Sequence, residues 1–252
     1  MWRVIASVHP VKFAIFSDIH GNLEALEAVL ADITAERVQE MICLGDIVGY
    51  GPNPAECLEM IRCLSCSVVM GNHDEACIEP EMEQALNEYA RAGVVFARNQ
   101  LSNAQKGWLR NRPLHLDFDD FTAVHASLSD DEPWQYVLSP ADALRHFMFQ
   151  EKPLCFCGHS HRPAVWTLEG RRVRCLAPAG NVTLPLGART LVNVGSVGQP
   201  RNLRPEACYA IYNRVALSIG FRFVPYNVKE TQGKILAAGL PRFLAQRLAL
   251  GR

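Results

Sequence analysis

Short apolar runs alternate with amphipathic stretches along the first half of the chain. Six runs of four to six residues, rich in β-branched and aromatic side chains, lie at 12–17, 40–44, 67–70, 121–124, 153–157 and 190–194. Runs of this length that end near glycine or small polar residues favour strands over helices. Between the first three runs, apolar residues recur with a helical period after Asn22 and after Pro54, which predicts two helices. Residues 12–70 therefore read as β-α-β-α-β.

The second half of the chain is less regular. Residues 75–112 have a helical period throughout, and Ser139, Pro140 and Asp142 mark the start of a further helix. Segments 165–170 and 171–176 predict a hairpin, 208–212 and 218–225 predict further strands, and the tail from about 229 to 250 is helical with a break at 239–241. We expect an α/β protein with an N-terminal extension at 1–10 and a single domain at 11–252.

Charge and composition exclude several classes of protein. Twenty-five Lys and Arg residues balance 26 Asp and Glu residues, which leaves a net charge of −1 and no basic surface for nucleic acid. No window approaches the roughly 18 to 20 apolar residues of a membrane span, and the first ten residues lack the long apolar region of an export signal. Nine cysteines, an odd number in a long chain, suggest reduced thiols. We therefore expect a cytoplasmic protein without a membrane or nucleic-acid partner.

Polar side chains suited to metal binding follow five of the predicted strands directly. In chain order these are Asp18 and His20, then Asp46, then Asn72, His73 and Asp74, then His125, and finally His159 and His161. Ligands of open α/β sheets bind beyond the carboxyl ends of the strands, so we expect these side chains to converge. The remaining histidines, His9, His115 and His146, have no such partners and are interpreted as structural.

The convergent set is too large for one ion. A single divalent ion takes about four to six such ligands, whereas seven of these residues, with one carboxylate bridging, suit two. Neutral imidazole combined with carboxylate and amide oxygen, without thiolate, favours Mn, Fe, Zn, Ni or Co. Two ions about 3.5–4 Å apart can ionise a bridging water and hold the attacking and leaving oxygens of a displacement at phosphorus. A nearly neutral chain would thereby gain a positive pocket for an anion.

Five motifs in this order resemble those of the calcineurin-like metallophosphoesterases. They are Asp18-Ile19-His20, Gly45-Asp46, Gly71-Asn72-His73-Asp74, His125 and Gly158-His159-Ser160-His161. The spacing is most similar to that of small bacterial and archaeal phosphoesterases. The resemblance implies a four-layer α/β/β/α sandwich with two mixed β-sheets.

The resemblance also implies a role for each motif residue. Asp18, His20 and His161 would bind one metal ion, Asn72, His125 and His159 would bind the second, and Asp46 would bridge both. Mn and Fe are the favoured metals. A hydroxide bridging the two ions would attack phosphorus, while His73 would protonate the leaving alkoxide or contact the phosphate. Asp74 would orient the His73 ring, because a carboxylate on one ring nitrogen fixes the tautomer.

One departure from the family concerns the substrate side of the site. Protein Ser/Thr phosphatases follow the second motif with an arginine-containing stretch, whereas residues 47–51 here are Ile-Val-Gly-Tyr-Gly. The arginine that binds phosphate must come from elsewhere, and Arg201 is the best candidate. Asn22 is a candidate for a phosphate contact at a helix N-terminus, and a simple helix cap explains it equally well.

The favoured function is hydrolysis of small phosphorylated substrates by a phosphomonoesterase. A phosphodiesterase or a dinucleoside-polyphosphate hydrolase is the alternative within the hydrolases. A metal-bound regulatory scaffold without turnover is an alternative of another class. The presence of His73 and Asp74 argues against the scaffold, since binding alone needs no acid for a leaving group.

Overall fold

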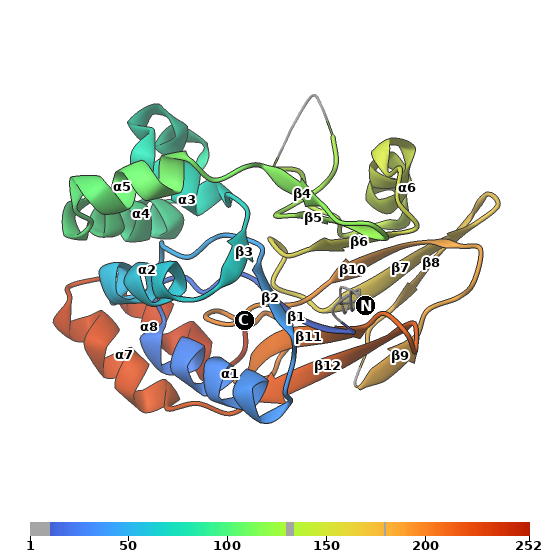
Figure 1. The fold of residues 1–252 in the computed structure, drawn as a ribbon. Coiled ribbons are helices and arrows are strands. Elements are labelled where there is room, and N and C mark those ends of the chain that lie inside the picture. Colours follow the sequence, from blue (N-terminus) through green and yellow to red (C-terminus); the bar gives the residue numbers. More distant parts are fainter. Residues whose placement is uncertain (1–10, 130–133, 179) are drawn as a thin grey trace, which may run out of the picture.

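The computed structural model describes residues 11–129, 134–178 and 180–252 (Figure 1). The expected N-terminal extension at 1–10 lies outside them. Two six-stranded sheets form the centre of the fold. The first runs in the order β3 (Cys66–Val68), β2 (Glu40–Cys43), β1 (Lys12–Phe16), β11 (Ala207–Asn213), β12 (Ser218–Val224) and β9 (Asn181–Thr183). The second runs in the order β4 (His115–Asp117), β5 (Phe121–Val124), β6 (Leu154–Cys157), β10 (Arg189–Asn193), β7 (Ala164–Glu169) and β8 (Arg172–Leu176).

Both sheets are mixed, as the sequence predicted. Strands β1, β2 and β3 are parallel to one another, and so are β5, β6 and β10, while the remaining pairs are antiparallel. The antiparallel half of each sheet includes a hairpin: β11–β12 in the first and β7–β8 in the second. The parallel strands place their carboxyl ends at one edge of each sheet.

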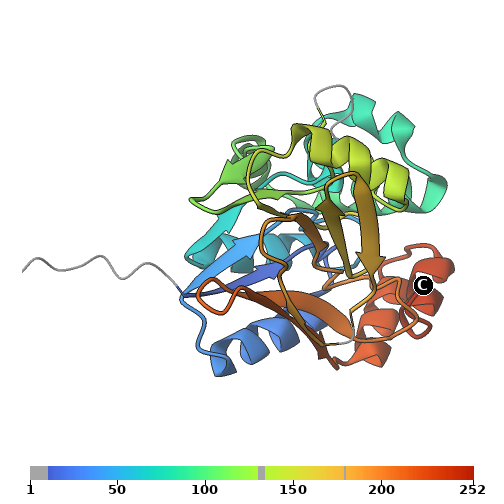
Figure 2. The same cartoon turned by 90° about the vertical axis from the view of Figure 1, so that its right-hand side faces the viewer.

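Helices cover the outer faces of the two sheets (Figures 1 and 2). Helix α1 (Leu23–Ala35) packs on β11 and β12, and α6 (Pro140–Phe149) packs on β7, β8 and β10. The other helical segments are α2 (Pro54–Cys63), α3 (Asn72–Ile78), the 3₁₀ segment η1 (Pro80–Ala85), α4 (Glu88–Gln100), α5 (Asn103–Arg110), α7 (Val228–Ala237) and α8 (Arg242–Leu248). The result is the expected α/β/β/α sandwich.

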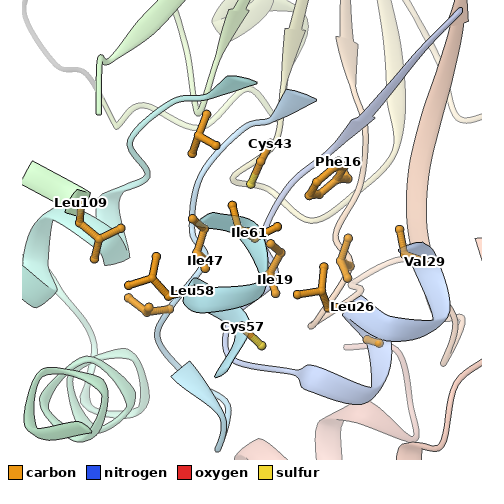
Figure 3. Packing of buried hydrophobic residues seen from close by; sticks show 14 of the residues in the cluster. Phe16, Ile19, Leu26, Val29, Cys43, Ile47, Cys57, Leu58, Ile61 and Leu109 are labelled. Atoms are coloured by element: carbon orange, nitrogen blue, oxygen red, sulfur yellow. The ribbon is translucent and has the colours of Figure 1, made fainter. Parts of the chain in front are cut away.

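Strand β1 shows why the central runs have consecutive apolar residues. Phe13 and Ile15 face the second sheet, where the Phe13 ring lies 5.4 Å from that of Phe121. Ala14 and Phe16 face the opposite way, into the cluster beneath α1 and α2 that Figure 3 shows. Because successive side chains of a strand point to opposite faces, a strand buried on both faces needs a continuous apolar run.

Some elements differ from the sequence prediction. Strands β4 and β9, three residues each, were missed because they are too short to show a periodic pattern. The helical stretch at 75–112 is divided into four segments, because Pro80 begins a 3₁₀ turn and the capping box of Ser102 begins α5. The break predicted at 239–241 lies at Gly239, whose φ is +72°.

In the described part of the chain, no helix has the length and apolar character needed to cross a bilayer.

Candidate metal centre

The ends of strands from both sheets meet at one place. The loops after β1, β2 and β3 come from the first sheet, and those after β5 and β6 come from the second. Eight of the nine motif residues are buried, with no more than 5% of the surface of any exposed, and Asn72 is partly buried: they are Asp18, His20, Asp46, His73, Asp74, His125, His159 and His161. The site therefore lies across the junction of the two sheets and not along the rim of one.

The donor atoms of these residues form overlapping groups. Three sets have donor atoms within 4.8 Å of one another: Asp18, His20 and His161; His20, Asp46 and His73; and Asp46, His125 and His159. Within them, His161 Nε2 lies 3.3 Å from Asp18 Oδ1, and His125 Nε2 lies 3.4 Å from Asp46 Oδ2. Asp46 and His20 each belong to two groups, and of the two only the carboxylate of Asp46 has two oxygens to offer.

Backbone carbonyls orient three of the histidine rings. The Nδ1–H groups of His20, His125 and His161 donate to Val48 O at 3.0 Å, Leu44 O at 2.7 Å and Gln199 O at 2.6 Å, respectively. A carbonyl can only accept, so the proton of each neutral ring is on Nδ1. The lone pair of Nε2 then faces the cluster, which is the arrangement that metal-binding histidines need.

The backbone is strained where the site is built. Five motif residues have φ between +50° and +64°: Asp18, His20, Asp46, His159 and His161. Left-handed backbone in residues other than glycine costs of the order of 1–3 kcal/mol each and persists where surrounding structure enforces it, commonly at functional sites. The strain aims these side chains at one point, at a cost that packing elsewhere must offset.

Two glycines allow the strand ends to approach so closely. A Cβ at Gly71 would lie 2.2 Å from Asp46 Oδ1, and a Cβ at Gly158 would lie 2.1 Å from Ser17 Oγ. The close approach lets backbone N–H groups hold the carboxylates: His73 N donates to Asp46 Oδ1 at 2.8 Å. The glycines of the Gly-Asn-His-Asp and Gly-His-Ser-His motifs are therefore required sterically.

Unpartnered polar atoms show that the cluster fits metal ions. Asp18 Oδ1 and His159 Nε2 are buried without a hydrogen-bond partner among the described residues, a costly state for polar groups. Burial lowers the pKa of His159 to about 3, so that imidazole is neutral, as a ligand must be. Burial opposes charge on Asp18, but His161 and His125 outweigh it and hold the pKa of Asp18 below its usual range. Burial opposes charge on His125, but Asp46 and Asp18 outweigh it and raise the pKa of His125 to about 9, so this ring would lose a proton when a cation binds its Nε2. Imidazole nitrogens and ionised carboxylates around shared positions suit divalent cations.

Comparison with known proteins gives the family. The calcineurin-like phosphoesterase superfamily domain matches residues 11–215. The chain belongs to this superfamily. It is 38% identical to a metallophosphoesterase from Sphaerobacter thermophilus of known crystal structure, with a TM-score of 0.85 and coverage of 97% of this chain and 100% of that one. The family therefore makes this protein a phosphoric ester hydrolase that uses divalent metal ions.

Two further relatives differ in how much of the chain they share. An uncharacterized protein of Methanocaldococcus jannaschii is 37% identical over 243 residues, which are 95% of this chain and 98% of that protein. A symmetrical bis(5'-nucleosyl)-tetraphosphatase of Vibrio vulnificus is 30% identical over 118 residues, 46% of this chain and 44% of its own length. This second match is partial, so the activity that its name gives belongs to that enzyme.

One predicted role in this phosphoesterase is wrong. Asp74 does not orient the ring of His73: its Oδ1 accepts the N–H groups of Ile47 at 3.0 Å and Val48 at 3.1 Å, and its Oδ2 accepts that of Gly71 at 3.2 Å. His73 Nδ1 is buried, and no residue that the structure describes forms a hydrogen bond with it. Consecutive residues of a helix do not share a face, and both lie in the first turn of α3. Asp74 instead holds the loop that follows Asp46.

Asn22 acts as a structural residue of this phosphoesterase. Its Oδ1 accepts the Ala25 N–H at 3.2 Å and the Thr231 hydroxyl at 3.1 Å, and its Nδ2 donates to Gly198 O at 2.8 Å. These contacts cap α1 and connect it to α7 and to the loop after β10. The helix-cap interpretation holds, and the structure gives no support to a phosphate contact from Asn22.

Arg201 lies beside the histidine cluster. Its backbone N–H donates to His161 O at 3.1 Å, and its Nη2 donates to Gln199 Oε1 at 2.9 Å. The pKa of His161 is lowered, by burial first and by the charge of Arg201 second. The Nε of Arg201 is buried and has no hydrogen-bond partner in the described part of the chain. The guanidinium is therefore close to the centre and has bonding capacity for an anion.

Two aromatic rings at the centre were not singled out from the sequence. The Tyr50 ring lies 4.5 Å from that of His73, and the Tyr136 ring is stacked on that of His159 at 3.9 Å. Tyr50 had a usable signal, because it lies four residues after Asp46 in the segment that departs from the protein phosphatases. Tyr136 follows no strand and no motif, so no local pattern indicates it.

Proposed function

We propose that this protein is a metal-dependent phosphatase that removes a terminal phosphoryl group from a small phosphorylated substrate. The observation that carries the proposal is the meeting of carboxylates with imidazoles at shared positions, next to an arginine whose Nε has no partner among the described residues. Asp18, His20 and His161 would hold one ion, Asn72, His125 and His159 the other, and Asp46 both.

Two divalent ions, with Mn or Fe favoured, would supply Lewis acidity and lower the pKa of water. The remaining chemistry belongs to the chain. Arg201 would bind an oxygen of the phosphoryl group and keep it oriented. A ring nitrogen of His73 lies within 4.8 Å of donor atoms of His20 and Asp46 and would carry the proton for the leaving oxygen.

The protonation of His73 would depend on the substrate. Burial is the largest cause that lowers its pKa, to about 4, and the charge of Arg201 contributes in the same direction. A phosphoryl dianion bound beside the ring favours the protonated form, because an opposite charge raises the pKa of an imidazole. The substrate would thus bring His73 into the state that a general acid requires.

Hydrolysis of dinucleoside polyphosphates is the second candidate. The bis(5'-nucleosyl)-tetraphosphatases that share part of this chain support it, and the matched 118 residues are about half of each protein. A metal-bound scaffold without turnover remains the alternative of another class, and the arrangement of His73 beside the carboxylates argues against it.

The test combines metal analysis with a substrate panel. We expect two ions per chain by elemental analysis, and Mn-dependent release of phosphate from an aryl monoester at a higher rate than from an aryl diester. Asp46→Asn and Asn72→Ala should each lower activity at least about 100-fold and reduce bound metal, since each removes a ligand. Asn99→Ala, at an exposed position of α4, is the matched control.

Each alternative has its own outcome. A higher rate on dinucleoside tetraphosphate than on any monoester would replace the phosphatase by the second candidate. Two bound ions without turnover of any substrate in the panel would indicate the scaffold. Full activity in Asp46→Asn would overturn the proposed centre.

A further inference from the structure

A second arginine lies at the same edge of the centre as Arg201. Arg247 belongs to α8, which packs on Tyr50 through Leu244 and Leu248. The chain after α8 is joined to the loop after Arg201, because Leu203 N donates to Gly251 O at 2.9 Å. α8 therefore brings Arg247 next to a loop from a distant part of the sequence.

The contact between these two segments is close. A Cβ on Gly251 would lie 2.4 Å from Arg204 N, and Gly251 has a φ of +59°. Both the space and the backbone conformation require glycine there. The close packing of the Gly251 backbone on that of Arg204 therefore holds the segment that follows Arg247 next to the segment that follows Arg201.

The two guanidinium groups are half-buried. Arg201 donates to Gln199 Oε1, and Arg247 donates from Nε to a carboxylate oxygen of Arg252, the last residue of the described chain. In the described part of the chain, neither forms an ion pair with an aspartate or glutamate side chain. Burial, followed by the charge of Arg201, lowers the pKa of Arg247 to about 10, so both groups are cationic at neutral pH. One terminal carboxylate does not balance two cations, and the buried Nε of Arg201 has no partner among the described residues, so a bound anion would compensate the remaining charge.

Arg201 and Arg247 lie beside the metal centre. The Cζ of Arg201 lies 6.0 Å from the centre of the Tyr50 ring, and Tyr50 contacts His73. Arg247 lies near enough to Tyr50 and Tyr136 for their hydroxyl groups to raise its pKa against burial, and Tyr136 is stacked on His159. An anion between the two arginines would therefore be adjacent to a phosphoryl group held at the centre.

We propose that Arg201 and Arg247 together bind a second phosphoryl group, which makes molecules that end in two or more linked phosphoryl groups, as a nucleoside diphosphate does, the preferred substrates. This inference rests on the proposed function, because the metal centre would hold the first phosphoryl group. Arginine suits the task, since its planar fork of donors matches the oxygens of phosphate.

The experiment compares two ligands that differ by one phosphoryl group. Binding of adenosine 5'-monophosphate and adenosine 5'-diphosphate to the Mn-loaded protein is measured by calorimetry. We expect the diphosphate to bind at least 10-fold more tightly to the native protein. Arg247→Gln should reduce this ratio to about 2 or less, and Arg247→Lys, which keeps the charge without the fork, should give an intermediate ratio. Arg242→Gln, at an exposed position of the same helix, should retain the native ratio.

The outcomes separate this inference from the proposed function. An unchanged ratio in a folded Arg247→Gln protein, or equal affinity of the native protein for both ligands, would overturn the second phosphoryl site while leaving hydrolysis intact. If Arg247→Gln lowers the affinity ratio as expected but the native protein hydrolyses no phosphate ester, the second phosphoryl site is supported and the proposed phosphatase activity is refuted.

Discussion

The backbone N–H of His159 donates a hydrogen bond of 3.0 Å to Oδ2 of Asp18. Asp18 follows β1 in the first sheet, and His159 follows β6 in the second. The bond occupies one carboxylate oxygen of Asp18, while Oδ1 remains unpartnered and faces the histidine cluster. The junction of the two sheets and the geometry of the site therefore depend on the same contact.

We expect Gly158→Ala to damage both stability and activity. The new Cβ would lie 2.1 Å from Ser17 Oγ and 2.5 Å from Asp18 Oδ2, so the two strand ends must separate. Overpacking of a tight contact costs about 1–3 kcal/mol, and displacement of Asp18 should lower phosphatase activity at least about 10-fold. Denaturant unfolding and a steady-state assay measure the two effects.

Gly233→Ala provides the matched control. Gly233 lies within α7 and is exposed, and a methyl group added there would meet no atom within 4 Å. Alanine should stabilise that helix by about 0.5–1 kcal/mol and leave activity unchanged. Equal stability of the Gly158→Ala and native proteins would show that the close contact is not needed.

Replacement of His73 by Gln should affect poor leaving groups most. If His73 supplies the proton, an alkyl phosphate, whose alcohol is a weak acid, needs it more than a 4-nitrophenyl phosphate does. We expect kcat to fall about 100-fold or more for the alkyl ester and considerably less for the aryl ester. A metal content equal to that of the native protein is the control, and an equal loss on both esters would assign His73 to phosphate binding instead.

His146 should make the protein less stable in acid. It is buried in α6, where its Nδ1 accepts the Leu128 N–H at 3.1 Å, and burial lowers its pKa to about 4. The unfolded chain, with a histidine pKa near 6.5, binds the proton more readily. The stabilisation is complete above about pH 6.5 and is lost as the pH falls toward 4, by up to about 3 kcal/mol.

Unfolding of His146→Gln between pH 7.5 and 4.5 tests this expectation. The variant cannot titrate at this position, so its free energy of unfolding should decline less steeply with acid than that of the native protein. His115→Gln, at an exposed position, should follow the native curve. Parallel curves for the native protein and His146→Gln would contradict the assignment.

Much of the parallel half of each sheet was predictable from local pattern. The runs that became β1, β2, β5 and β6 are mostly apolar, because both faces are buried along β5 and β6, along β1 after Lys12 and along the second half of β2. The donors that follow them directly are placed at the strand ends by chain connectivity alone. The predicted run at 67–70 was displaced, with β3 at Cys66–Val68, because a strand of three residues carries little periodic signal.

The roles of individual side chains were less predictable. Sequence adjacency suggested that Asp74 supports His73, whereas the direction of each side chain from α3 gives Asp74 three backbone donors instead. Asn22 could equally have been a cap or a phosphate contact, and only its partners in α7 and the loop after β10 decided the matter.

The sequence by itself predicted which side chains converge, since apolar strands that end in Asp, Asn and His imply a convergent donor set wherever the strands run parallel. Tertiary structure alone decided that the donors come from two sheets, and that Tyr136 and Arg247 join them. These choices depend on packing between segments far apart in the chain, such as the apposition of Gly251 and Arg204. Local sequence patterns reflect burial and backbone preference. They do not indicate which distant segment of the chain packs against a given residue.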